Sequence, residues 1–155
     1  MPSWCPLPEI IEALKVAASV LTHPVRLTRP CLIEVRLTSR SPEPVLINRR
    51  LAVGYRDRHA RELFAEVFRR GSGEIVSQPT LLYQRDFSRP EDYGPLAPGE
   101  SVATTFDVFQ WYALPSAGDF DLVVSYQADE PRAPKPAGLL AGTYASERVT
   151  FHVAP

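Results

Sequence analysis

The sequence has few of the residues that hold small scaffolds together by covalent bonds or metal. Its 155 residues include two cysteines, Cys5 and Cys31, and three histidines. No closely spaced cysteine or histidine pairs form a zinc motif. A chain of this length buries roughly 68–70% of its unfolded surface and needs no such staple. We expect two free thiols in a reducing compartment; they would pair only if the N-terminal arm folded back onto the first core strand.

Long apolar runs and strong net charge are also missing. Residues 10–21 are the longest nearly apolar stretch, and Glu12 and Lys15 interrupt it, so it is too short and too charged to span a bilayer. The formal net charge is −1, which argues against a nucleic-acid binder. No basic segment precedes an apolar one at the start, so we expect a cytoplasmic protein, or an extracellular one if a leader was removed.

Glycine, lysine and asparagine are scarce as well. There are eight glycines against 16 prolines, and proline breaks helix interiors, so few long helices are expected. Only two of the 17 basic residues are lysines, and Asn48 is the single asparagine, which we interpret as the coding bias of a GC-rich bacterial genome. The arginines favour planar, forked ion pairs.

Alternation with period two dominates the chain and is typical of half-buried strands. It covers residues 14–20, 31–38, 102–108, 120–126 and 149–153, with shorter runs at 45–53, 63–68, 75–76 and 81–83. As an alternative, residues 8–21 fit a helix that begins at Pro8; we favour a strand from about residue 13, which is compatible with a short helical turn before it.

Loops rather than helices separate these runs, which predicts an all-β antiparallel sandwich. We expect an N-terminal arm over residues 1–12 and one domain over residues 13–155. Two longer loops, residues 86–94 and 128–142, join the later strands. The second carries prolines at 131, 134 and 136, which favours a semi-rigid loop at a sheet end.

Several segments resemble bacterial immunoglobulin-like domains. Residues 32–38 and 44–51 are similar to their first core strands, and residues 96–102 to the L-x-P-G-E-S entry to a later strand. Residues 117–126 and 146–153 look like their last two strands. Such domains flank deuterolysin-like metallopeptidases, and bacterial intracellular proteinase inhibitors are similar in plan. The resemblance covers about residues 13–154 and implies an immunoglobulin-like sandwich of about 7–9 strands. Its motifs belong to strands and turns, so it carries no site residue with it.

Catalytic patterns are absent from the sequence. No serine lies in a G-x-S-x-G turn, no glycine run fits a phosphate loop, and His59 with Glu62 gives only a weak ligand pair. Cys31 begins a core strand and is expected to be buried and inert. His152 is expected on the outer face of the last strand, and His23, before Pro24, in a turn. We therefore predict that the protein is not an enzyme and binds no cofactor or metal.

Two features suggest an interaction surface. The first is a cluster of arginines in residues 49–70, which we interpret either as partners of acids in the second half or as a surface for an acidic partner. The second is the aromatic pair Phe109 and Trp111, which would face outward if the alternation continued beyond Val108, or would cap the core if the strand bent there. The candidate surface consists of Arg49, Arg50, Arg56, Arg58, Arg61, Phe109 and Trp111.

The predicted function is a non-catalytic protein-interaction module that binds through a sheet edge or end loops, with a proteinase-inhibitor-like domain as its specific form. The partner would be a protein with an acidic surface or a peptidase, not nucleic acid or membrane. A homodimer through an edge strand is a further expectation. The alternatives are a carbohydrate-binding accessory module, for which Trp111 would supply the aromatic platform, and a structural subunit of a larger assembly.

Overall fold

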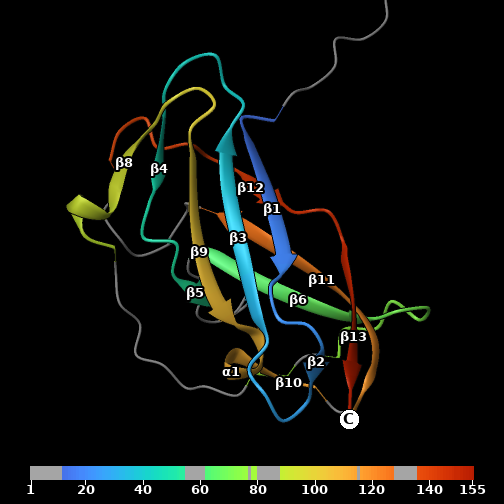
Figure 1. Cartoon of the computed structure of the whole chain (residues 1–155). Helices are drawn as coiled ribbons and strands as arrows, with labels where there is room; N and C mark the ends of the chain where they lie inside the picture. Colours follow the sequence, from blue (N-terminus) through green and yellow to red (C-terminus); the bar gives the residue numbers. More distant parts are fainter. Residues whose placement is uncertain (1–11, 55–61, 77, 80–87, 115, 128–135) are drawn as a thin grey trace, which may run out of the picture.

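The alternating segments form strands that lie in two facing sheets and two small strand pairs (Figure 1). The structure is a computed structural model that describes residues 12–54, 62–76, 78–79, 88–114, 116–127 and 136–155. The strands are β1 Leu14–Val20, β2 Val25–Arg26, β3 Leu32–Ser39, β4 Val45–Asn48, β5 Val53–Gly54, β6 Leu63–Arg69, β7 Gln78–Pro79, β8 Tyr93–Leu96, β9 Ser101–Asp107, β10 Tyr112–Ala113, β11 Gly118–Gln127, β12 Thr143–Ala145 and β13 Val149–Ala154. The helical pieces are η1 Pro90–Asp92 and α1 Val108–Trp111.

The smaller of the two facing sheets has the order β1-β3-β9 and is antiparallel throughout. The larger has the order β2-β13-β11-β6-β5, and β12 also pairs with β11. In Figure 1, β6 and β11 cross behind β3 and β9. The remaining pairs are β4 with β8 and β7 with β10. Within the described residues the chain is thus mostly β-structure, as its alternation predicts.

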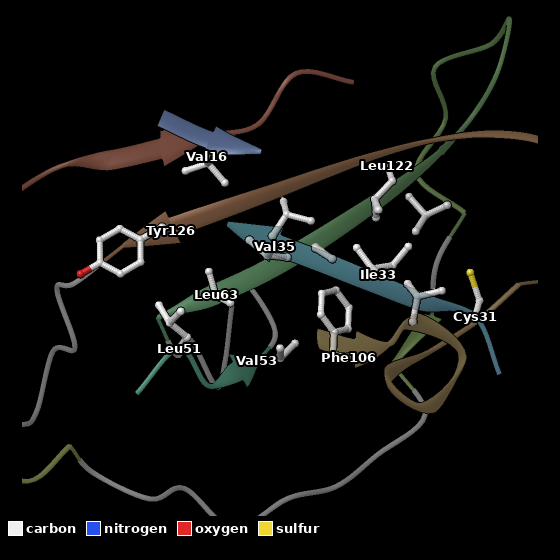
Figure 2. Close-up of a cluster of buried hydrophobic side chains, with 14 of the residues drawn as sticks. Val16, Cys31, Ile33, Val35, Leu51, Val53, Leu63, Phe106, Leu122 and Tyr126 are labelled. Carbon is white, nitrogen blue, oxygen red and sulfur yellow. The ribbon is translucent and has the colours of Figure 1, made fainter. Parts of the chain in front are cut away.

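One hydrophobic core lies between the two sheets because each strand turns alternate side chains inward. From the smaller sheet come Ile33, Val35 and Leu37, each with no exposed surface. Leu122 of β11 and Leu63 of β6 meet them from the larger sheet and are equally buried (Figure 2). Burial of an aliphatic side chain of this size stabilises the fold by roughly 1.5–3 kcal/mol. The core therefore ties both sheets into one unit.

Several strands in the structure differ in detail from those predicted from the sequence. The ambiguous N-terminal segment is a strand from Leu14, while the alternative helical turn falls outside the described residues, as does the predicted run 81–83. The run 45–53 divides into β4 and β5, and Ile75 forms only an isolated bridge to Phe68. The expectation of purely antiparallel pairing is wrong for two strand pairs, β2 with β13 and β5 with β6, and for the isolated bridge between Leu46 and Leu139. β2 and β5 are two-residue strands whose pairing depends on where the chain returns to the sheet.

The alternation that begins in β9 does not continue beyond Asp107. The Asp107 carboxylate accepts hydrogen bonds from the Phe109 N–H at 3.0 Å and the Cys31 N–H at 2.9 Å, and so caps the turn α1. As a result, Gln110 is exposed, whereas Phe109 and Trp111 are partly buried and pack against the core. Of the two orientations expected for this aromatic pair, the structure has the second, in which the strand bends and the pair lies against the core, so the pair does not form an outward-facing surface.

Candidate functional site

A groove opens where the edge of the smaller sheet passes the edge of the larger one. Its volume is about 510 Å³, within the range typical of ligand sites. The smaller sheet contributes the end of β1, the larger sheet contributes β13, and the connection into β2 also lines the groove; Figure 1 shows where these strands lie. The lining is mostly apolar, with two histidines and two hydroxyl groups: Ala18, Ser19, Val20, His23, Pro24, Val25, Val149, Thr150, Phe151, His152 and Ala154.

The edge of β1 that faces away from β3 carries unpaired backbone groups. Leu21 donates its N–H to the Leu32 carbonyl at 2.8 Å, and Arg40 donates to the Ala13 carbonyl at 2.8 Å. In an antiparallel pair such bonded positions recur every second residue, so residues 15, 17 and 19 bond to β3. The N–H and C=O groups of Val16, Ala18 and Val20 point the other way. Among the described residues, no strand pairs with β1 on that side.

The outer edge of β13 is also open for part of its length. β2 covers only its last residues, since Val25 pairs with Val153 and Arg26 with Ala154. Leu27 donates its N–H to the Ala154 carbonyl at 3.2 Å, so the even-numbered residues of β13 direct their backbone groups to this edge. Within the described residues, Thr150 therefore faces the groove on an edge without a strand partner. Two incomplete edges thus border one groove.

The histidines of the groove lie as the sequence predicts. His152 is exposed on the outer face of β13, and its Nδ1 lies 2.8 Å from Oδ1 of Asp119 on β11. His23 is exposed in the connection between β1 and β2, before a cis peptide bond to Pro24. Both imidazoles offer polar nitrogen atoms at the rim of an otherwise apolar groove. Such a combination of apolar lining and a few polar groups suits a binding site.

Cations without partners lie on the strands around this groove. Lys15 of β1, Arg26 of β2 and Arg29 just after it are exposed, and no ion pair engages them in the part of the chain that the structure describes. The acids on the neighbouring strands are already paired: Glu34 lies 3.3 Å from Arg36, and Asp119 contacts His152. Arg26 and Arg29 thus leave unpaired positive charge at the β2 end of the groove, whereas the exposed acids Glu12 and Glu147 lie before β1 and β13 at the other end.

A second polar cluster, away from the groove, is buried at the start of β6. Glu62 is 1% exposed, and its carboxylate receives both Nε and Nη2 of Arg50, at 3.1 and 2.6 Å. It also accepts from the Asn48 side-chain amide at 3.0 Å, from the Ser88 hydroxyl at 3.2 Å and from the Ala52 N–H at 2.9 Å. Through these hydrogen bonds the carboxylate joins the segment after β4 to β6. Because both of its oxygen atoms already accept hydrogen bonds in a buried position, neither is available to a substrate.

Tyr126 ties the same cluster to β11. Its hydroxyl accepts the backbone N–H of Asn48 at 2.9 Å, and its side chain has no exposed surface. Burial raises the pKa of Tyr126 well above its ordinary value, and the nearby Glu62 carboxylate raises it further. The phenol thus stays neutral and serves as a structural hydrogen-bond partner rather than a base.

The predicted arginine surface is divided. Arg50 pairs with Glu62, and Arg49 donates to the Pro95 carbonyl at 2.7 Å and lies 3.7 Å from Glu100. At the other end of β6, Arg69 lies over the Phe120 ring and Arg70 lies 3.7 Å from Asp121. Arg56, Arg58 and Arg61 lie outside the described residues. Arg49 and Arg70 thus pair with acids of the second half, which was the first interpretation of the arginine cluster.

The sequence analysis missed both the groove and the acceptor role of Glu62. The available signal for the groove was the interruption of the strand pattern at residues 21–24. The chain leaves the sheet of β1 at this point, and a strand that ends this way can leave one of its edges unpaired. The burial of Glu62 had no signal, since a charged residue beside a run of arginines is ordinarily exposed. The buried Cys31 and the outward His152 agree with prediction.

The described residues hold no group of three or more His, Cys, Asp or Glu side chains placed to bind a metal ion. Among those residues, no helix is both long and apolar enough to cross a membrane. No family model matches the sequence, and no curated protein matches it. The geometry of the chain itself must therefore carry the functional argument.

Proposed function

We propose that the chain is a non-catalytic protein-interaction module and that the groove between β1 and β13 is its binding site. The observation that carries this proposal is the groove itself, with an apolar lining bordered by two incomplete strand edges. Such edges are places where another chain can pair. The clusters away from the groove are engaged in structural contacts, as with Glu62 and Arg50.

We further propose that the scaffold is an immunoglobulin-like sandwich of a cytoplasmic protein. In chain order, β1, β3 and β9 correspond to strands A, B and E of that fold, and β6, β11 and β13 to strands C, F and G. A buried free thiol at Cys31 supports a reducing compartment. The sequence resemblance to domains beside metallopeptidases and to intracellular proteinase inhibitors makes a peptidase one candidate partner.

The carbohydrate-binding alternative has weaker support. It requires an exposed aromatic platform at Trp111, but this side chain is partly buried and packs against the core. An inhibitor that inserts a loop would instead use residues 86–94 or 128–142, and residues 128–135 fall outside the described part. The groove therefore supports protein binding through a sheet edge better than it supports carbohydrate binding at Trp111.

The test fills the groove with a large side chain. Thr150→Trp places an indole at an exposed strand position in the lining, and Thr105→Trp makes the same change at an exposed position of β9 that does not line the groove. Wild type and both variants serve as baits in a lysate of the source organism, and the retained protein is then purified and titrated calorimetrically. We expect at least about ten-fold weaker binding for Thr150→Trp only. Equal binding by all three baits, or no direct binding, would refute the proposed site.

A further inference from the structure

We infer that the segment bound in the groove is an extended acidic stretch of a partner protein, which adds as a strand to the free edge of β1. This inference rests on the proposed function and names the chemistry of its ligand. Its basis is the backbone of Val16, Ala18 and Val20, whose donors and acceptors point away from β3. A peptide strand satisfies such a row of groups through main-chain hydrogen bonds.

The free edge is available for this pairing within the described structure. The side chains of Val16, Ala18 and Val20 pack against the core, but within the described residues no hydrogen bond joins their outward backbone groups to another strand. Ala18 and Val20 line the groove, which supplies space beside the edge. An added strand would extend the smaller sheet beyond β1 and cover the unpaired groups.

The side chains around the edge define what the added strand should look like. A strand that extends the sheet would alternate between the groove and the outer face. On the groove side it meets apolar residues, Phe151 and Val149 among them. On the outer face of β1 the exposed cation is Lys15, and Arg26 and Arg29 are exposed at β2, which pairs with the end of β13. Alternating apolar and acidic residues fit both environments, because the cations lack partners and would select negative charge.

The test uses three synthetic ten-residue peptides and amide exchange measured by NMR on the full-length protein. One peptide alternates valine and glutamate, one alternates valine and lysine, and one is the glutamate peptide with alternate amides N-methylated. We expect the glutamate peptide to slow exchange at Ala18 and Val20 at least about ten-fold, while Ala17 and Ser19 stay protected by β3 throughout. The lysine peptide should bind about ten-fold more weakly at low salt, and N-methylation should abolish binding.

Two variants at one position separate backbone pairing from side-chain contact. Ala18→Pro removes the outward N–H, whereas Ala18→Val keeps it and places a strand-forming side chain at the same site. We expect Ala18→Pro to lose the glutamate peptide and Ala18→Val to retain it. Equal binding by both variants, without protection at Ala18 and Val20, would overturn strand addition but leave the groove as a binding site. Failure of the peptide to bind would overturn the acidic-strand inference, while the Thr150→Trp comparison would still decide the proposed function.

Two other occupants have distinct signatures. If residues 1–11 of the same chain filled the edge, Ala18 and Val20 would be protected without peptide at every protein concentration. If a second copy filled it, their protection would rise with concentration together with a dimeric mass by light scattering. Either result would overturn the inference. In contrast to the homodimer expected from the sequence, the inference requires a monomer whose Ala18 and Val20 amides exchange quickly until peptide is added.

Discussion

At the scale of single residues, the most consequential side chain is Glu62. Its burial would be costly for an isolated carboxylate, but Arg50, Asn48, Ser88 and the Ala52 N–H all donate to it. Such an arrangement is neutral or favourable only while every donor keeps its acceptor. The cluster therefore fixes the path of the chain between β4 and β6 at the price of depending on one residue.

We predict that Glu62→Ala destabilises the fold by about 3–5 kcal/mol, because it leaves a partly buried guanidinium and three further donors without this acceptor. The measurement is urea denaturation, with the free energy of unfolding extrapolated to water. Glu74→Ala, at an exposed turn position, is the matched control and should change this free energy by no more than about 0.5 kcal/mol. A loss for Glu62→Ala as small as that of the control would contradict the structural role assigned to the carboxylate.

Cys31 links stability to alkaline pH. Burial, with a smaller contribution from Asp107, raises the pKa of the thiol from 9.0 to about 11. The unfolded thiol therefore ionises first, so the stability from keeping it neutral is complete below pH 9 and is lost as pH rises towards 11, by about 3 kcal/mol at most. In Cys31→Ala the free energy of unfolding should fall less over this interval than in wild type. Val35→Ala, a buried change without an ionisable group, should leave the slope unaltered; parallel slopes for all three proteins would contradict the linkage.

At the scale of elements, the sequence was informative wherever one face of a strand is buried. The alternation in residues 14–20, 120–126 and 149–153 predicted β1, β11 and β13 because apolar and polar positions mark the two faces. It failed at α1, where the Asp107 cap overrides the pattern, and at β2, which is too short to show a period. The groove could not be predicted, because it depends on which edges the tertiary pairing leaves open.

The alternation of bonded and free backbone positions along β1 gives a direct prediction for stability. The Ala17 N–H is directed to Arg36 of β3, whereas the Ala18 N–H points to the free edge. Proline at residue 17 removes a ladder bond and places its ring against β3, so Ala17→Pro should cost at least about 2 kcal/mol more than Ala18→Pro. Chemical denaturation of the two variants measures this difference. Equal losses would show that the assignment of bonded and free positions on β1 is wrong.

At the scale of the whole molecule, charge and core connect distant parts of the chain. Residues 1–70 carry 12 basic and 7 acidic residues, and the remainder carries 5 and 11. Ion pairs such as Arg49 with Glu100 and Arg70 with Asp121 join the two halves at the surface. Exposed pairs of this kind stabilise little, so the shared core must hold the sheets together. The groove lies beside the edges of both sheets, and its lining includes Val25 and Phe151 of that core.

A shared core predicts one cooperative unfolding transition, whichever sheet is weakened. Leu37 in β3 and Leu122 in β11 are both fully buried, and each Leu→Ala change should cost about 2–5 kcal/mol through the lost burial and the cavity left behind. In both variants, loss of far-UV circular dichroism should coincide with exposure of the Cys31 thiol to a labelling reagent, since Cys31 belongs to the same core cluster. If Leu122→Ala lost circular dichroism while Cys31 stayed protected, the larger sheet would unfold on its own. The smaller sheet, with the free edge of β1, would then be a separate folding unit.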